Sequence, residues 1–295
     1  MPETTITYNG QDISVSEQTA PVRVSYNGAQ IASIAAGGSK TLNCNGKVML
    51  SNVSVGGKTL NCNGKLMQSD VLIAVAQGID PVFTNNTWEQ IIDACQNNAV
   101  PDTWAVADQK AMTINGANYM IDIIGKNHDT YTGGGTAPLT FQMHDCYGTK
   151  YKMNSNSSAT NTPGWGTSTM RTQYLPSILS NMPTAVKNAI REVQKTTTRG
   201  NRSTSLTTTA DKLFLLSEIE AKGSITSSGS GEGSRYAYYA AGNPTAKKLA
   251  GTNTNWWLRS PSVRNTANYC AVMTQSSLTG ASSNTEQGVA PAFCF

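Results

Sequence analysis

The sequence predicts an α+β protein built in two parts, a repetitive β-hairpin stem over residues 1–78 and a globular domain over residues 79–295. The first observation behind this prediction is the dipeptide Asn-Gly, which begins at positions 9, 27, 45 and 63, a period of 18 residues. The second is that the rest of the chain mixes helical apolar stripes with short alternating segments, separated by long loops. The length of 295 residues also fits two domains.

The Asn-Gly repeat predicts a stack of β-hairpins. Short alternating segments such as Ile6-Thr7-Tyr8 precede the dipeptide, and Asn-Gly is typical of the type I′ turn because both turn positions need a positive φ. Each repeat carries too few apolar side chains to build a core of its own. We therefore expect several chains to associate in a trimeric β-prism stem, with an intrachain solenoid as the alternative.

The globular domain is expected to begin with a helix. Thr87 and Gln90 form a capping-box pattern, and a helical apolar stripe continues to about Asn98. The further elements expected are, in chain order, strands over Trp104–Val106, Tyr119–Ile124 and Thr140–His144, a helical region from Thr172 to about Lys195 that breaks at Pro183, a short buried strand or helical turn over Leu213–Leu216, and a mobile surface loop over Ser224–Ser234.

Charge and hydropathy argue against two classes of partner. The net charge is only +4, and the basic side chains that follow one another from residue 187 to 202 predict a solvated helix face rather than a phosphate-binding patch. They are Lys187, Arg191, Lys195, Arg199 and Arg202. No apolar run reaches the roughly 18 residues that a membrane span needs, and the N-terminus does not resemble a classical secretion signal. We expect neither nucleic-acid binding nor membrane insertion.

The cysteines and histidines predict no metal site, no cofactor and no catalytic group. The six cysteines show no CxxC spacing and are expected to be reduced, with a disulfide between Cys270 and Cys294 as the alternative. His128 and His144 are each followed by Asp, and Cys146 would share a strand face with His144. A thiolate–imidazole pair is one interpretation of that spacing, and ordinary sheet residues are the favoured one.

The last forty residues predict a binding surface on a fixed frame. An apolar run opens the segment at Trp256-Trp257-Leu258 and another, Val289 to Phe295, closes it. The frame residues are expected to be Trp256, Trp257, Arg259 and Phe293, with Arg259 donating hydrogen bonds to loop carbonyls. The receptor-binding residues are expected to be Ser262, Val263, Arg264, Asn265, Thr266, Asn268, Thr274, Ser276, Ser277, Leu278, Thr279, Ser282, Ser283 and Asn284.

This C-terminal pattern resembles the variable proteins of diversity-generating retroelements, the family that includes the major tropism determinants of phage tail fibres. The run Trp256 to Pro261, the polar middle and the ending Gly288 to Phe293 carry the resemblance. It implies a C-type-lectin-like fold for the C-terminal domain and a variable region at about residues 255–287. The polar positions belong mostly to the set that adenine-directed mutagenesis of AAY codons reaches, while Met273, Glu286 and Gln287 do not. An undiversified lectin-like tail domain has the same pattern.

The resemblance implies a receptor-binding tail fibre protein of a phage, or a phage-derived protein, located at the virion tail after assembly in the bacterial cytoplasm. Its expected partners are a host cell-surface protein or glycan, two further copies of the chain in a homotrimer, and other tail proteins contacted through the stem. The alternatives are an undiversified adhesin at the bacterial cell surface and an enzyme that degrades cell-surface glycans. The sequence lacks the Glu-Pro-Asn and Trp-Asn-Asp motifs of calcium-dependent lectins and the close cysteine pair of formylglycine-generating enzymes.

Overall fold

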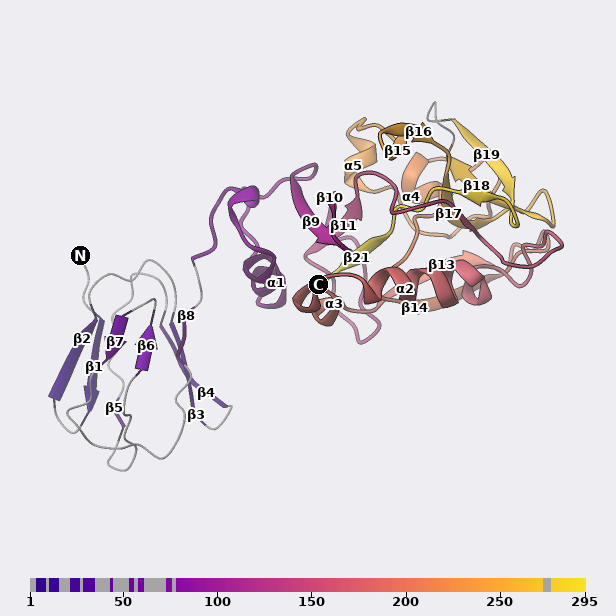
Figure 1. Cartoon of the computed structure of the whole chain (residues 1–295). Coiled ribbons are helices and arrows are strands. Elements are labelled where there is room, and N and C mark those ends of the chain that lie inside the picture. Colours follow the sequence, from indigo (N-terminus) through magenta and orange to yellow (C-terminus); the bar gives the residue numbers. More distant parts are fainter. Residues whose placement is uncertain are drawn as a thin grey trace. The chain divides into compact units, whose positions relative to one another are not determined.

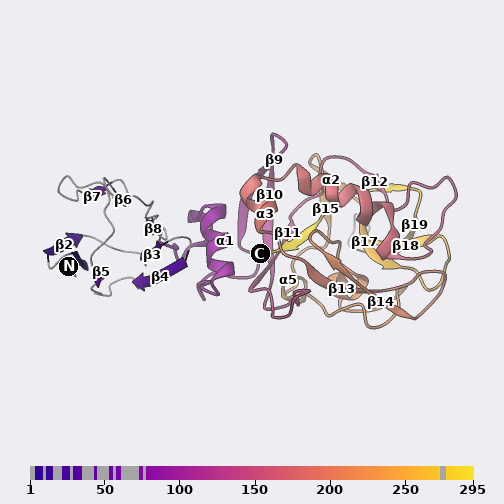
Figure 2. The same ribbon diagram turned by 90° about the horizontal axis from the view of Figure 1, so that it is seen from below.

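The computed structural model describes residues 78–272 and 277–295, together with the backbone of the strands that lie within residues 1–77. The chain divides into two compact units, Met1–Asp80 and Pro81–Phe295. The second unit is an α+β domain of short helices and several small antiparallel sheets (Figures 1 and 2).

The first unit contains the two hairpins that the first Asn-Gly dipeptides predict. Strand β1 pairs with β2 and β3 pairs with β4, and two residues separate the strands of each pair. The four Asn-Gly dipeptides themselves lie outside the described residues. The strands of this unit are β1 (Thr4–Tyr8), β2 (Gln11–Val15), β3 (Val22–Tyr26), β4 (Ala29–Ile34), β5 (Asn43–Cys44), β6 (Val53–Val55), β7 (Lys58–Leu60) and β8 (Ile73–Val75).

The later repeats pair differently from the earlier ones. Strand β5 pairs in parallel with β1, β8 pairs with β3, and β6 and β7 form a hairpin on either side of Gly56-Gly57 rather than around Asn-Gly. Gly-Gly is also a hairpin dipeptide, and it competes with Asn-Gly for the turn in this part of the chain. The first two Asn-Gly hairpins are confirmed, and hairpins at the third and fourth dipeptides stay a prediction, because the segments that follow them lie outside the described residues.

The central sheet of the second unit has the strand order β21-β11-β10-β9, all antiparallel. Its strands are β9 (Gln109–Ile114), β10 (Ala117–Lys126), β11 (Leu139–Met143) and β21 (Ala292–Cys294). Asn115 and Gly116 both have positive φ, as a two-residue hairpin turn requires. Every residue of β11 is buried, and Phe141 stacks on Phe293 of β21. The two strands expected over 119–124 and 140–144 are confirmed.

A third strand expected over Trp104–Val106 is absent from the described residues. Ala107 has a positive φ of 77°, and the backbone N–H of Ala105 donates to the Asp108 carboxylate instead of to a neighbouring strand. The apolar pattern there reflects burial of Trp104, whose ring packs edge-on against Phe83 of the short 3₁₀ helix Phe83–Asn85.

Helix α1 (Trp88–Gln96) begins at the predicted capping box, in which Thr87 and Gln90 satisfy each other's backbone N–H. The second helical region is shorter than expected. It contains a π-helical turn (Met170–Tyr174), α2 (Leu175–Ser180) and α3 (Thr184–Ala189), and residues from Val193 onward form a strand. The β-branched run Thr196-Thr197-Thr198 favours extended backbone and explains the change.

The remaining elements connect the central sheet to the C-terminal sheet. They are β12 (Tyr151–Lys152), the 3₁₀ helix Trp165–Thr167, β13 (Val193–Thr198), β14 (Leu206–Asp211), α4 (Glu218–Lys222), α5 (Ala237–Ala240), β15 (Lys247–Leu249), β16 (Thr252–Thr254) and β20 (Glu286–Gln287). Within the described ranges, none of the helices has the length and apolar character that a membrane crossing requires.

The C-terminal sheet has the order β17-β18-β19, with β17 (Trp256–Pro261), β18 (Asn268–Val272) and β19 (Leu278–Ser282). In Figures 1 and 2 it lies at the end of the second unit away from α1. The final segment ties it to the central sheet, because Gly288 bridges to Trp256 before β21 pairs with β11. Cys270 and Cys294 are both free thiols, so the alternative of a disulfide between them is wrong.

Candidate functional site

The frame of the C-terminal sheet is completely buried. Trp256, Trp257, Arg259 and Phe293 each have an exposed fraction of 0%. The indole N–H of Trp256 donates to the Thr245 carbonyl at 2.9 Å, and that of Trp257 donates to the carbonyl of Tyr151 in β12 at 2.8 Å. Each tryptophan therefore fills the core and also fixes a separate loop.

The expected receptor-binding residues differ in how far the structure exposes their side chains. The exposed ones are Arg264, Asn265, Thr266 and Ser277, and the half-buried ones are Val263, Asn268, Leu278, Thr279, Ser282 and Asn284. Ser262 and Ser283 are buried. Thr274 and Ser276 lie outside the described residues. The exposed and half-buried residues occupy the β17–β18 loop, the first position of β18, and strand β19 with its flanks, on one small sheet.

Ser262 and Ser283 belong to the frame rather than to the binding surface, which corrects the sequence-based assignment. Their exposed fractions are 3% and 0%. The Ser283 hydroxyl accepts a hydrogen bond from the backbone N–H of Thr160 at 2.9 Å, and the Ser262 hydroxyl accepts one from the backbone of Arg264 at 3.2 Å. A small polar side chain suits a buried turn as well as an exposed loop, so residue type alone does not separate the two positions.

One buried side chain, Asn161, holds the β17–β18 loop and the β13–β14 loop together. Its amide nitrogen lies 2.7 Å from the Asn265 carbonyl oxygen, 2.8 Å from that of Asn268 and 3.0 Å from that of Ser262. Its amide oxygen accepts a hydrogen bond from the Asn201 backbone at 2.8 Å. Asn161 has an exposed fraction of 0%. Asn161 lies in a Ser/Asn-rich stretch that has the composition of an ordinary loop, so the sequence does not indicate that this side chain joins two loops.

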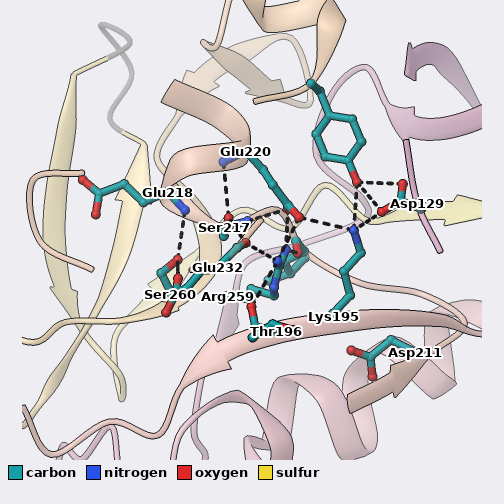
Figure 3. A network of polar contacts seen from close by, with 12 residues as sticks. Asp129, Lys195, Thr196, Asp211, Ser217, Glu218, Glu220, Glu232, Arg259 and Ser260 are labelled. Carbon is teal, nitrogen blue, oxygen red and sulfur yellow. Dashed lines mark hydrogen bonds and ion pairs between the residues drawn. The ribbon is translucent and has the colours of Figure 1, made fainter. Parts of the chain in front are cut away.

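Beneath the sheet lies a network of buried ion pairs (Figure 3). Arg259 donates from Nη1 to Glu220 Oε2 at 2.5 Å and from Nη2 to Glu220 Oε1 at 2.9 Å, a two-pronged pair. Arg259 also donates to the carbonyls of Leu215 and Glu232. On the other side of Glu220, Lys195 lies 3.3 Å from Glu220 Oε1 and pairs with Asp129. The network joins β13, α4 and β17.

The carboxylates of this network are held ionised by their partners. Burial alone raises the pKa of Asp129, but the charge and hydrogen bond of Lys195 outweigh it and keep this pKa below its usual range. Burial likewise opposes ionisation of Glu220, and the charges of Arg259 and Lys195 lower its pKa overall. The pattern is that of structural ion pairs, because neither carboxylate is poised to exchange a proton near neutral pH.

Lys195 corrects the expectation of a solvated basic helix face. Its exposed fraction is 2%, it lies on strand β13, and its ammonium also donates to the Tyr236 hydroxyl at 2.9 Å. Arg191, by contrast, is exposed and lies over the ring of Tyr131. The basic side chains from 187 to 202 therefore do not form one surface.

The Gly/Ser-rich segment over 224–234 is anchored to the frame, unlike the free loop expected. The Glu218 carboxylate accepts hydrogen bonds from the backbone N–H groups of Thr226, Ser227 and Ser228. Glu232 is completely buried and its carboxylate accepts from the backbone and hydroxyl of Thr198, both at 2.8 Å. Burial raises the pKa of Glu232.

A cavity of about 210 Å³ lies beside the ion-pair network. Its wall includes His128, Gln194 and Gly233 together with the network residues. Lys195, Asp129, Glu220 and Arg259 are already paired with one another, so the wall presents no unpaired charge from this network.

His144 and Cys146 show no contact of the kind that a thiolate–imidazole pair needs. His144 Nδ1 lies 2.9 Å from Asp122 Oδ2, and Cys146 is buried with a pKa raised to about 12 by desolvation. A thiol of that pKa is a poor nucleophile at neutral pH. His128 stacks on Tyr236 with ring centroids 4.0 Å apart. Among the described residues, no group of three or more His, Cys, Asp or Glu side chains could hold a metal ion.

The two histidines are expected to titrate on opposite sides of their ordinary pKa of 6.5. The hydrogen bond with Asp122 raises the pKa of His144, whereas burial lowers that of His128. The contribution of His144 to stability is therefore full below pH 6.5 and is lost as the pH rises through its folded pKa. NMR titration of the full chain measures both, since it has two histidines. In Asp122→Asn the His144 midpoint should fall, and an unchanged midpoint would contradict the assignment.

Comparison with known proteins gives one family match. The model of a domain of unknown function, DUF6273, matches residues 140–295, more than half of the chain. No curated protein and no solved structure matches the chain. The matched segment includes Asn161, Lys195, Glu220, Arg259 and the whole C-terminal sheet. The chain therefore belongs to the family that is defined by this domain of unknown function, DUF6273.

Proposed function

We propose that this protein is a receptor-binding tail protein of a phage, or derived from one, whose C-terminal face binds a protein or glycan on the host surface. The observation that carries the proposal is the way the β17–β18 loop is held. Its exposed side chains Arg264, Asn265 and Thr266 stand on a backbone whose carbonyls are bound by Asn161, a buried residue about one hundred positions earlier in the chain. The backbone shape of the loop therefore does not depend on which side chains it exposes.

A frame of this kind suits a surface whose side chains vary. Exposed substitutions usually change stability by no more than about 0.5 kcal/mol, whereas the frame residues Trp257 and Arg259 are buried. Asn, Ser and Thr offer adaptable hydrogen bonding, as they do in antibody loops. Diversification by a retroelement is part of the proposal. A neighbouring reverse-transcriptase gene, with a near-copy of this coding segment that differs only at adenines, would establish it.

The proposal gives the second unit a C-type-lectin-like fold and the first unit the role of a trimerising stem at the virion tail. Three copies on one stem would strengthen a weak single-site interaction by raising the effective concentration of the second and third sites. Light scattering of the purified full chain measures the assembly. A monomer at micromolar concentration would contradict the stem, and would leave the binding face to be tested separately.

Blocking the face is expected to abolish adsorption without unfolding the protein. Thr266→Tyr combined with Ser277→Tyr places two bulky side chains at exposed positions. Adsorption to host cells should fall at least tenfold, because the receptor can no longer approach, while the thermal midpoint stays the same. The matched control is Gln96→Tyr with Ser177→Tyr, which adds the same side chains to exposed positions on α1 and α2. Equal adsorption by both double variants would refute the assignment of the face.

The proposal is one of binding without catalysis. The burial of Cys146 and the absence of a nucleophile within hydrogen-bond reach of His144 among its described contacts support it. A depolymerisation assay on host capsule tests the enzyme alternative. Capsule degradation that is lost in His144→Asn would contradict a role limited to binding.

A further inference from the structure

Three exposed arginines stand at the tips of the two hairpins that Asn161 joins. Arg199 and Arg202 lie in the β13–β14 loop, and Arg264 lies in the β17–β18 loop. Among the described residues, none of the three makes a salt bridge with a carboxylate, whereas Arg171 and Arg259 do.

The hydrogen bonds of Asn161 bring these arginines to one place. Asn161 binds the backbone of Asn201, next to Arg202, and the carbonyl of Asn265, next to Arg264. The backbone of Gly200, next to Arg199, packs so closely on Asn161 that an added Cβ would overlap the Asn161 carbonyl. All three arginines therefore leave the backbone within one or two residues of a shared contact.

The loop that carries two of them has an uncommon backbone. Gly200, Asn201 and Arg202 have φ values of 77°, 52° and 59°, three successive residues in the left-handed region. Glycine and asparagine tolerate this region, but a long side chain such as arginine is uncommon there. Strained conformations of this kind persist where the surroundings impose them, and they gather at functional sites.

The segments that meet at this face contain no acidic residue. Residues 154–164, 199–210 and 261–285 include neither Asp nor Glu. The carboxylates of Glu218 and Glu232, which hold the neighbouring segments, are buried and accept several backbone hydrogen bonds from the frame. Glu286, which follows the last of these segments, is exposed. The face is thus positively charged by composition, and most of its other exposed side chains are amides and hydroxyls, with Pro163, Leu206 and Ala210 as the apolar ones.

We propose that the receptor bound at this face is an acidic polysaccharide of the host surface, an inference that rests on the proposed function. An arginine guanidinium binds carboxylate, sulfate or phosphate groups through paired N–H donors. The amides and hydroxyls of Asn201, Asn265 and Thr266 suit the sugar hydroxyls between the charges. A nucleic acid would also bind arginine, but single-stranded recognition relies on exposed aromatic rings, and Tyr269 of this sheet is buried.

Binding of the full chain to immobilised alginate and dextran sulfate, with dextran as the neutral polymer, tests the inference. The triple variant Arg199→Gln, Arg202→Gln, Arg264→Gln should bind the acidic polymers at least tenfold more weakly than the unmodified chain. Binding by the unmodified chain should also weaken as salt rises. The matched control, Lys150→Gln with Lys212→Gln and Lys248→Gln, removes the same charge from exposed positions elsewhere, and its affinity should change less than twofold.

Three results would overturn the inference: equal binding by the arginine triple variant, an equal loss in the lysine control, or dextran binding as tight as alginate binding. Tighter binding to single-stranded DNA than to either acidic polymer would overturn it as well. Host adsorption of the same variants separates the two proposals. If Thr266→Tyr with Ser277→Tyr abolishes adsorption but the arginine triple variant adsorbs normally, the result supports the receptor-binding face and refutes the acidic ligand.

Discussion

Replacing Arg259 with methionine is expected to lower the free energy of unfolding of the second unit by about 3–5 kcal/mol. The substitution keeps the apolar stem but removes the guanidinium that pairs twice with Glu220. Glu220 would remain buried with Lys195 as its one cationic partner, at 3.3 Å. Two backbone carbonyls, those of Leu215 and Glu232, would lose a donor in the same place. A buried carboxylate that keeps only one of its two cationic partners is costly to hold ionised.

Guanidinium denaturation followed by tryptophan fluorescence measures this effect in the full chain, because all five tryptophans lie in the second unit. The matched control is Arg264→Met, which makes the same chemical change at an exposed position and should shift stability by no more than about 0.5 kcal/mol. A loss below about 1 kcal/mol in Arg259→Met would contradict the view that this ion pair supports the frame.

The pH dependence gives the same variant a second readout. The pKa of Glu220 is lowered in the folded protein, so its contribution is present above its ordinary value of 4.5 and is lost as the pH falls through the folded pKa. Without Arg259 the folded pKa should rise, and the stability of the variant should depend less on pH in the acid range. An unchanged acid profile would show that Glu220 is held ionised by Lys195 alone.

Local signals in the sequence predicted those parts of the fold that depend on neighbouring residues. The capping box at Thr87 needs only Gln90 three positions on, and the burial of Trp256 and Trp257 follows from their size. Among the local elements, the predicted helix is wrong from Val193 onward, where the structure has a strand. An apolar spacing compatible with a helix continued past Ala189, but the threonine run that follows favours extended backbone, and pairing with β14 decides the outcome.

The residues that position the site depend on contacts between distant parts of the chain. Lys195 meets Asp129 across 66 positions and Arg259 meets Glu220 across 39. No local pattern distinguishes a lysine that will be buried beside an aspartate from one that will be solvated, so the basic run by itself predicts a solvated surface. Ser262 and Ser283 show the converse, because a small polar residue fits a buried turn and an exposed loop equally well.

Replacing Asn161 with alanine is expected to destabilise the second unit by about 2–4 kcal/mol and to abolish receptor binding, although no exposed side chain changes. The carbonyls of Ser262 and Asn265 and the N–H of Asn201 would lose this partner, and the Asn268 carbonyl would keep only the hydrogen bond from the Ser262 N–H. Each buried polar group left unpaired costs roughly 1–3 kcal/mol, and water entering the vacated space would offset part of the sum. The two loops would then move independently.

The control for this substitution is Asn243→Ala, since Asn243 is half-buried and donates to a single carbonyl, that of Tyr238, at 2.9 Å. It should cost no more than about 1.5 kcal/mol and leave adsorption unchanged. Adsorption and alginate binding are measured well below the melting temperature, so that both variants are folded during the assay. If Asn161→Ala is destabilised but still binds at full strength, the loops do not need Asn161 for their binding shape. If it loses binding while folded, the receptor recognises an arrangement of two loops that one buried amide holds, and variation of the exposed residues can proceed without disturbing it.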